Sequence, residues 1–367
     1  MRLLREGTML RDTYEVDRFL GAGAFGEVYR VKHRFLGRQA MKVIKTPGMT
    51  LEEAHRMLGE AIILSRVGHP NIVRVFDAGL VDTPQGACAY FTMEYVAGGT
   101  LEDFWKSHGA AFVPVETSVE ILRQACRGLA VAHAEKPPIV HRDIKPQNIL
   151  VGYDASGLRV RISDFGLARS VDPLTLLASA RGTRRFKGPE VFLDPMSDSC
   201  AGDIWGLGCT LYLLLCDRLP YDEVPDHEVQ AGRFTAHRLA PPSRFNHRVD
   251  DRLDAIVMRA LAPKPAQRYA TAERMLVDLQ AWQAPAPAKA APLAGEGSLL
   301  SKDAFGAVPL HDDSGALKRA ERAIALARLP GKLSEAADLM EEALAHAPGL
   351  RERYEYQVRL WRKGVVM

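Results

Sequence analysis

The pattern of apolar and polar positions divides the 367-residue chain into a strand-rich front and a helix-rich back. Residues 14 to about 45 alternate and are rich in β-branched and aromatic side chains, which predicts consecutive strands joined by turns. Residues 51–67 have apolar positions at helical spacing, and His69-Pro70-Asn71 ends that helix. Further helices are predicted, between loops, at 117–136, 200–216, 251–262 and 271–283. This order predicts two lobes of an α+β fold.

The pattern changes twice after residue 283. Residues 284–309 are rich in alanine and proline, which predicts a linker. Residues 310–367 follow as a helical tail. Four of its positions match the spacing of a tetratricopeptide repeat, namely Ala336, Met340, Ala343 and Pro348. Two interpretations stay open for the tail, a single repeat-like module and a plain helical hairpin that ends in proline.

Composition excludes several classes of protein. Hydrophobic residues make up 47% of the chain and charged residues 25%, close to soluble globular averages, and the net charge of +3 is too small to favour nucleic acid as a partner. The longest apolar run, residues 205–216, is shorter than the ~20 residues that span a bilayer, and the first residues lack the apolar core of a signal peptide. Five cysteines without zinc spacing suit a reduced compartment. We therefore expect a cytoplasmic protein that binds neither nucleic acid nor membrane.

A glycine-rich run is the first candidate ligand site. Gly21, Gly23 and Gly26 would let the backbone approach a phosphate chain closely, since no side chain blocks the amide groups. A dinucleotide-binding fold uses a similar run, but it begins a helix at the third glycine, whereas the residues after Gly26 have a strand pattern. The run is therefore expected to be a turn between strands that covers phosphates.

Three further motifs follow in order. Residues 141–148 read His-Arg-Asp-Ile-Lys-Pro-Gln-Asn, residues 164–166 read Asp-Phe-Gly, and residues 188–190 read Gly-Pro-Glu. Together they match the protein kinase template of a catalytic loop, a metal-binding aspartate and a Pro-Glu motif. The chain therefore resembles the eukaryotic-type (Hanks-type) serine/threonine protein kinases, in a bacterial-like form, over residues 12–283. The resemblance implies a bilobal fold with an antiparallel N-lobe over about 12–96 and a mostly helical C-lobe over about 97–283.

The resemblance also implies a set of site residues, with ATP and Mg²⁺, or alternatively Mn²⁺, as cofactors. The catalytic residues are expected to be Asp143 as the base, Lys145, Lys42, Asn148 and Thr183. The metal ligands are expected to be Asn148 and Asp164. The ATP-binding residues are expected to be Leu20, Gly21, Gly23, Phe25, Gly26, Val28, Ala40, Lys42, Glu60, Met93, Glu94, Val96 and Leu150. Within this set Glu60 is expected to form an ion pair with Lys42.

The acceptor and the regulation follow from the same resemblance. Lys145 and Thr183 resemble the residues that the serine/threonine-specific branch places beside the catalytic base. The segment between the Asp-Phe-Gly and Pro-Glu motifs is strongly basic, so a phosphate on it would find charged partners. We expect autophosphorylation there, with three candidate sites, Ser170, Thr175 and Ser179. A basic segment that only contacts acidic substrates is the alternative.

Two other functions stay open beside a kinase that acts on protein substrates. A pseudokinase scaffold would lack Lys42, Asp143 or Asp164, and all three are present. A small-molecule phosphotransferase would lack three elements that shape a protein-substrate site, His69-Pro70-Asn71, Gly182-Thr183 and Gly188-Pro189-Glu190. Independently of the activity, the helices of the tail could bind a protein partner.

Overall fold

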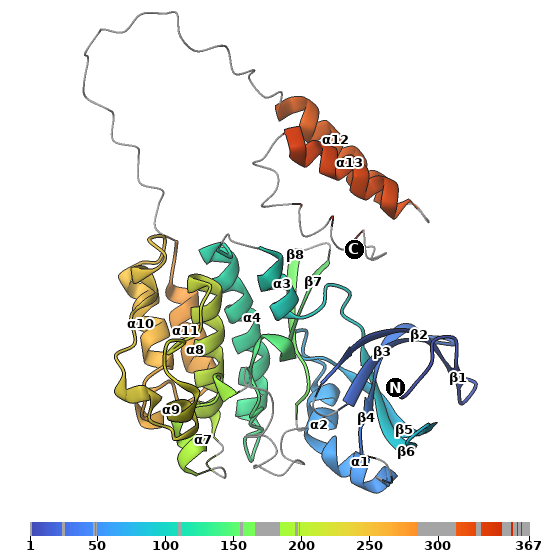
Figure 1. The fold of residues 1–367 in the computed structure, drawn as a ribbon, viewed down its shortest axis with the longest axis horizontal. Coiled ribbons are helices and arrows are strands. Elements are labelled where there is room, and N and C mark those ends of the chain that lie inside the picture. The colour runs from blue at the N-terminus through green and yellow to red at the C-terminus, as the bar shows by residue number, and fades with distance from the viewer. Residues whose placement is uncertain are drawn as a thin grey trace, which may run out of the picture. The chain divides into compact units, whose positions relative to one another are not determined.

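The computed structural model describes two compact units, Met1–Gln283 and Ala284–Met367. The residues it describes are 2–23, 26–46, 48, 50–108, 112–154, 157–165, 184–194, 197, 199–284, 313–327, 332–346, 354, 358 and 361. Figure 1 shows that the first unit has a strand lobe and a helical lobe. The predicted α+β, bilobal architecture is therefore confirmed.

The strand lobe is built on a six-stranded antiparallel sheet with the strand order β1-β2-β3-β4-β6-β5. Its strands are β1 (Met9–Leu10), β2 (Tyr14–Ala22), β3 (Gly26–His33), β4 (Gly37–Ile44), β5 (Val75–Thr83) and β6 (Gly86–Glu94). Lys42 on β4 lies opposite Val28 on β3 and Phe91 on β6. The lysine therefore sits on an inner strand, where two neighbours fix its backbone position.

The helix predicted over residues 51–67 is divided in two, α1 (Leu51–Met57) and α2 (Gly59–Val67). Leu58 lies at the break, and its side chain is 1% exposed. The helical spacing of buried apolar residues therefore continues across the break. Gly59 follows, and glycine costs a helix interior about 1 kcal/mol relative to alanine. Gly68 ends α2 in the left-handed conformation, with φ of 69°, which places the helix end just before His69 as predicted.

The helical lobe surrounds a central helix, α8 (Cys200–Cys216), whose residues from Asp203 onward are all buried. This helix is apolar on every face because other helices cover it. The other helices are α3 (Leu101–Ser107), α4 (Val115–Ala134), α7 (Pro189–Leu193), α9 (Asp226–Gln230), α10 (Asp251–Ala260) and α11 (Ala272–Ala281). A two-stranded sheet of β7 (Ile149–Asp154) and β8 (Gly157–Ile162) follows the short 3₁₀ turn η1 (Pro146–Asn148). Further 3₁₀ turns are η3 (Phe234–Ala236), η4 (Pro242–Arg244) and η5 (Pro265–Gln267).

The segment before β2 packs onto the sheet beside the glycine-rich turn. Leu3 and Leu4 are buried in the apolar cluster of the strand lobe. The Leu3 amide donates to the Glu27 carboxylate at 2.9 Å, and the Leu4 amide donates to the Tyr29 hydroxyl at 2.9 Å. Both acceptors lie on β3, so residues 2–10 brace the strand that follows the glycine-rich turn.

Replacing Leu3 by alanine should destabilise the strand lobe by about 2 kcal/mol or more, because the side chain is only 3% exposed and its removal leaves a cavity. Thermal unfolding of the purified chain would measure the loss. Met9→Ala is the matched control, because Met9 is 55% exposed and should change stability by no more than ~0.5 kcal/mol. Equal effects of the two substitutions would show that the segment does not pack as described.

The second unit contains two helices, α12 (Asp313–Ala327) and α13 (Leu333–His346), which share one apolar cluster. Ala336, Met340 and Ala343, three of the positions that match a repeat, are fully buried in it. Three residues further along the chain also belong to the cluster, namely Tyr354, Val358 and Trp361. Pro348 and the predicted linker, apart from Ala284, lie outside the described residues, and the choice between a repeat and a hairpin stays open. None of the helices in the described part of the chain is long and apolar enough to cross a membrane.

Candidate active site

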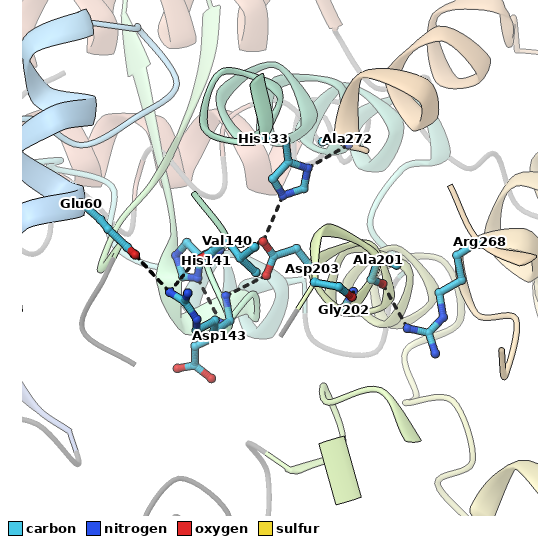
Figure 2. Close-up of polar contacts among 12 residues, drawn as sticks. Glu60, His133, Val140, His141, Asp143, Ala201, Gly202, Asp203, Arg268 and Ala272 are labelled. Carbon is cyan, nitrogen blue, oxygen red and sulfur yellow. Dashed lines mark hydrogen bonds and ion pairs between the residues drawn. The ribbon is translucent and has the colours of Figure 1, made fainter. Parts of the chain in front are cut away.

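The backbone of the catalytic loop is held by one buried carboxylate at the start of α8. Asp203, 2% exposed, accepts hydrogen bonds from the amides of His141 at 2.7 Å and Arg142 at 2.8 Å, and from His133 Nε2 at 3.1 Å (Figure 2). Burial alone would raise the pKa of Asp203, but these donors outweigh it and hold the pKa below its usual value. The Asp203 carboxylate therefore anchors the backbone of this loop.

Asp143, the expected base, is 6% exposed and surrounded by cations and donors. Its Oδ2 accepts from Lys145 Nζ at 2.7 Å and from Asn148 Nδ2 at 3.0 Å, and its Oδ1 accepts from Lys187 Nζ at 3.0 Å. Burial alone would raise the pKa of Asp143, yet Lys187 and Lys145 hold it well below the usual range. The carboxylate is therefore ionised and oriented before any substrate arrives.

Arg142 and Asp164 both have left-handed backbones, with φ of 68° and 65°. Non-glycine residues adopt this conformation at a cost and only where their surroundings enforce it, and such residues cluster at functional sites. At Arg142 the enforcing contacts are its amide bonded to Asp203 and its guanidinium bonded to the carbonyl of Val140 and to Glu60. The strained residues are thus the one directly before the expected base and the expected metal ligand.

The structure gives Lys42 and Glu60 partners other than the pairing expected from the sequence. Lys42 Nζ forms an ion pair with Asp164 Oδ2 at 2.7 Å. Glu60 Oε2 instead pairs with Arg142 at 3.1 Å, and Figure 2 shows the Glu60 side chain at this contact. The reason is competition: Arg142, turned by its left-handed backbone, reaches the first turn of α2 and offers Glu60 a fixed guanidinium. The Lys42–Glu60 expectation is corrected accordingly.

The donor set beside Lys42 suits a magnesium ion. Asp164 Oδ1 is buried and has no hydrogen-bond partner among the described residues, so one acceptor stands ready for a cation. Asn148 uses its amide NH₂ on Asp143, which leaves its carbonyl oxygen for a metal. Magnesium is commonly held by one or two protein oxygens together with substrate phosphates and water. Asp164 and Asn148 therefore fit the ion that the sequence implies.

An apolar cluster on the strand lobe unites the residues expected to enclose adenine. Ala40 and Met93 are buried in it, and Val28 and Leu150 pack against it. Ala40 lies opposite Met93 across β4 and β6, and Gln39 lies opposite Glu94. Three further ATP-binding candidates lie at the edges: Leu20 is 40% exposed, and Glu94 and Val96 are half-buried.

The glycine-rich run closes a turn between β2 and β3. The amide of Gly23 donates to the carbonyl of Gly26 at 2.8 Å across the turn. A Cβ atom on Gly21 or Gly23 would meet nothing within 4 Å, so open space lies above these two residues. A Cβ atom on Gly26 would overlap the carbonyl oxygen of Val43 on β4, so the close approach of the two strands requires glycine. Phe25 lies outside the described residues.

Other expected residues cannot be placed in this geometry. Thr183 and the candidate phosphorylation sites Ser170, Thr175 and Ser179 lie outside the described residues. Conversely, Lys187 contacts Asp143, which the basic character of its segment does not indicate. Lys187 directly precedes the Gly-Pro-Glu motif, but nothing in the spacing indicates that its side chain turns back to the catalytic loop.

The Pro-Glu motif is fixed by a buried ion pair. Both nitrogens Nη1 and Nη2 of Arg268 donate to Glu190, each at 2.7 Å, and the Arg268 side chain is fully buried. Arg268 also donates to backbone carbonyls, including that of Ala201 at the start of α8 (Figure 2). The pairing with Glu190 and the contact with Ala201 together tie α7 to α8.

A strand lobe carrying a glycine-rich turn and a lysine, above a helical lobe carrying an Asp-Asn catalytic loop, defines the bilobal kinase class. The profile described as the protein kinase domain matches residues 14–278. This chain therefore belongs to the protein kinase domain family.

Curated relatives are bacterial serine/threonine kinases, as the resemblance implied. Serine/threonine-protein kinase PknB of Mycolicibacterium smegmatis is 34% identical over 281 residues, covering 74% of this chain and 43% of that protein. A probable serine/threonine-protein kinase of Clostridium perfringens is 32% identical over 278 residues, covering 75% and 39%. The chain thus spans less than half the length of these relatives. The solved kinase domain of Mycobacterium tuberculosis PknI is 27% identical with a TM-score of 0.56, covering 76% of this chain and 99% of that one.

Proposed function

We propose that this chain is a serine/threonine protein kinase that transfers the γ-phosphate of ATP to hydroxyl groups of protein substrates. The observation that carries the proposal is the intact set of charged groups around one point: Asp143 ionised between two lysines, with Asn148 beside it, and Lys42 paired with Asp164. Kinase catalysis depends on positioning and on neutralising phosphate charge, and these groups supply both.

Each residue has a role that its contacts support. Asp143 would accept the hydrogen bond of the acceptor hydroxyl and orient it toward the phosphate. Lys42 would neutralise phosphate charge, and Asp164 and Asn148 would hold Mg²⁺, or Mn²⁺ in its place, which offsets charge on the phosphates when bound. Lys145, 2.7 Å from Asp143, supports the serine/threonine assignment, because its ammonium lies beside the carboxylate to which the acceptor hydroxyl would bond.

The geometry also supports a protein rather than a small-molecule substrate. The Pro-Glu motif after the catalytic loop is fixed in place by Arg268, and this element shapes a site for an extended chain. Free cysteines and the need for ATP favour action in the cytoplasm, with proteins as substrates and the C-terminal helices as a surface for a protein partner. We also propose autophosphorylation at Ser170, Thr175 or Ser179.

Lys42→Met should reduce phosphate transfer by about 100-fold or more, because the substitution removes the ammonium that neutralises phosphate charge. Radiolabelled ATP with magnesium or manganese, and a generic acceptor such as myelin basic protein, would measure the transfer. Mass spectrometry of the same reactions would locate phosphate on the chain itself, with Asp143→Asn as the blank.

Lys32→Met is the matched control, because Lys32 lies on β3 of the same sheet and is exposed to solvent. It should transfer phosphate at the wild-type rate. Absence of transfer by the wild-type chain with either metal would contradict the proposed function and favour a scaffold.

A further inference from the structure

Lys187 reaches from the segment before α7 into the catalytic loop. Its Nζ donates to Asp143 Oδ1 at 3.0 Å and to the backbone carbonyl of Arg142. The Lys187 side chain is only 10% exposed, so these contacts are shielded from solvent and from salt. An ammonium group kept there forms part of the site rather than of the surface.

The two carboxylate oxygens of Asp143 accept hydrogen bonds from different donors. Oδ2 accepts from Lys145 and from Asn148, which satisfies both of its lone pairs. Among the described residues Oδ1 accepts from Lys187 alone, which leaves one lone pair on that oxygen for a further donor. Because Lys187 fixes Oδ1 and the other donors fix Oδ2, the carboxylate cannot rotate about its Cβ–Cγ bond, and the remaining lone pair points in one direction.

The anchor for Lys187 is itself rigid. Glu190, three residues further on, is held by the bidentate pair with the buried Arg268. Gly188 lies between them, and a Cβ atom there would overlap the Glu190 carboxylate, so the backbone packs directly on that ion pair. Lys187 therefore links a fixed element of the helical lobe to the carboxylate of the catalytic loop.

We propose that Lys187 is a positioning residue, which holds the Asp143 carboxylate so that its free lone pair on Oδ1 faces the acceptor hydroxyl. The inference rests on the proposed kinase function and deepens it, because it assigns Lys187, beside Lys145, to hold the catalytic base. It predicts that Lys187 affects the turnover of bound substrates rather than the binding of ATP, since Lys187 contacts only the catalytic loop among the site residues described here.

Lys187→Met removes the ammonium group at nearly constant side-chain length. We expect kcat to fall about 10- to 100-fold, because a small misplacement of a reacting group has that effect, while the KM for ATP stays within about twofold. Lys187→Arg should restore part of the loss, because a guanidinium can also donate to Oδ1. Lys106→Met is the control, because Lys106 is 60% exposed and its ion pair is with Glu102 on its own helix.

Three kinetic results for the Lys187 variants would overturn the inference. A rise in kcat on Lys187→Met would mean that the amine blocks the base, and an unchanged kcat would mean that it has no part in the reaction. If Lys187→Arg and Lys187→Met lose the same fraction of kcat and both raise the KM for ATP, the loss comes from general damage to the fold. Lys187 would then not be a positioning residue.

A second measurement separates this inference from the proposed function. Melting temperatures of the wild type, Lys187→Met, Asp143→Asn and the double variant form a cycle that needs no catalysis. We expect the double variant to lose less than the sum of the single losses, because both single substitutions break the same contact. An additive cycle would overturn the Lys187–Asp143 contact even if the chain transferred no phosphate at all.

Discussion

Asp164→Asn should reduce phosphate transfer by about 1,000-fold or more while leaving the fold intact. The substitution removes the negative charge that pairs with Lys42 Nζ at 2.7 Å. It also replaces the buried Oδ1, which has no hydrogen-bond partner in the described part of the chain, with a poorer cation ligand. Because the Lys42 side chain is only 7% exposed, the loss of its partner should also lower the melting temperature, although the chain should still fold. The loss of phosphate transfer should be far larger than this loss of stability can explain.

Nucleotide binding with and without magnesium would identify the cause of the loss. The wild type should bind ATP more tightly when magnesium is added, and Asp164→Asn should lose most of that difference. Asp154→Asn is the matched control, because Asp154 is a carboxylate on β7 that pairs with Arg159 at the surface. Metal dependence that survives in Asp164→Asn would remove this residue from the expected ligand set.

Asp203→Asn should destabilise the first unit by about 3–5 kcal/mol, the usual cost of breaking a buried charged network. The carboxylate accepts two backbone amides and one imidazole, and an asparagine amide would point a donor at one of these donors. Because those amides belong to His141 and Arg142, catalysis should fall together with stability. Thermal or urea unfolding would measure the loss, with the exposed Asp222→Asn as the control.

The effect of Asp203 on stability should depend on pH in one direction. The folded pKa lies below the ordinary value for aspartate of about 3.9, so the unfolded chain binds the proton more readily. The stability that the carboxylate contributes is fully present above about pH 4 and is lost as the pH falls through the folded pKa. The gap between the wild type and Asp203→Asn should therefore be widest at neutral pH and narrow in acid; a gap that widens in acid would contradict this account.

Much of the fold follows from the sequence because long periodic segments specify their own type. The helix over residues 200–216 matches its prediction exactly in both ends, and the strands over residues 14–45 appear as β2, β3 and β4. The break at Leu58 was not predicted, because a buried leucine at helical spacing continues the apolar pattern whether or not the backbone stays helical. Periodicity records which side chains are buried, not every turn of the backbone.

In the candidate site, too, some contacts could be predicted from the sequence and others could not. The placement of Asn148 beside Asp143 could be predicted, because the resemblance to protein kinases puts both residues in the catalytic loop. The partner of Glu60 could not, because it depends on the left-handed backbone of Arg142, which turns a guanidinium toward α2. Likewise, no spacing rule shows that the Lys187 side chain folds back to Asp143.

The glycine-rich turn combines two unrelated physical requirements in one short motif. Gly21 and Gly23 border open space, so their lack of a side chain serves whatever occupies that space. Gly26 instead sets the separation between β3 and β4, and Lys42 lies on β4 directly before Val43, the residue whose carbonyl a Cβ would strike. Substitutions at Gly21 or Gly23 should thus change the access of a ligand to the turn. A substitution at Gly26 should instead change how β4, which carries Lys42, aligns with β3.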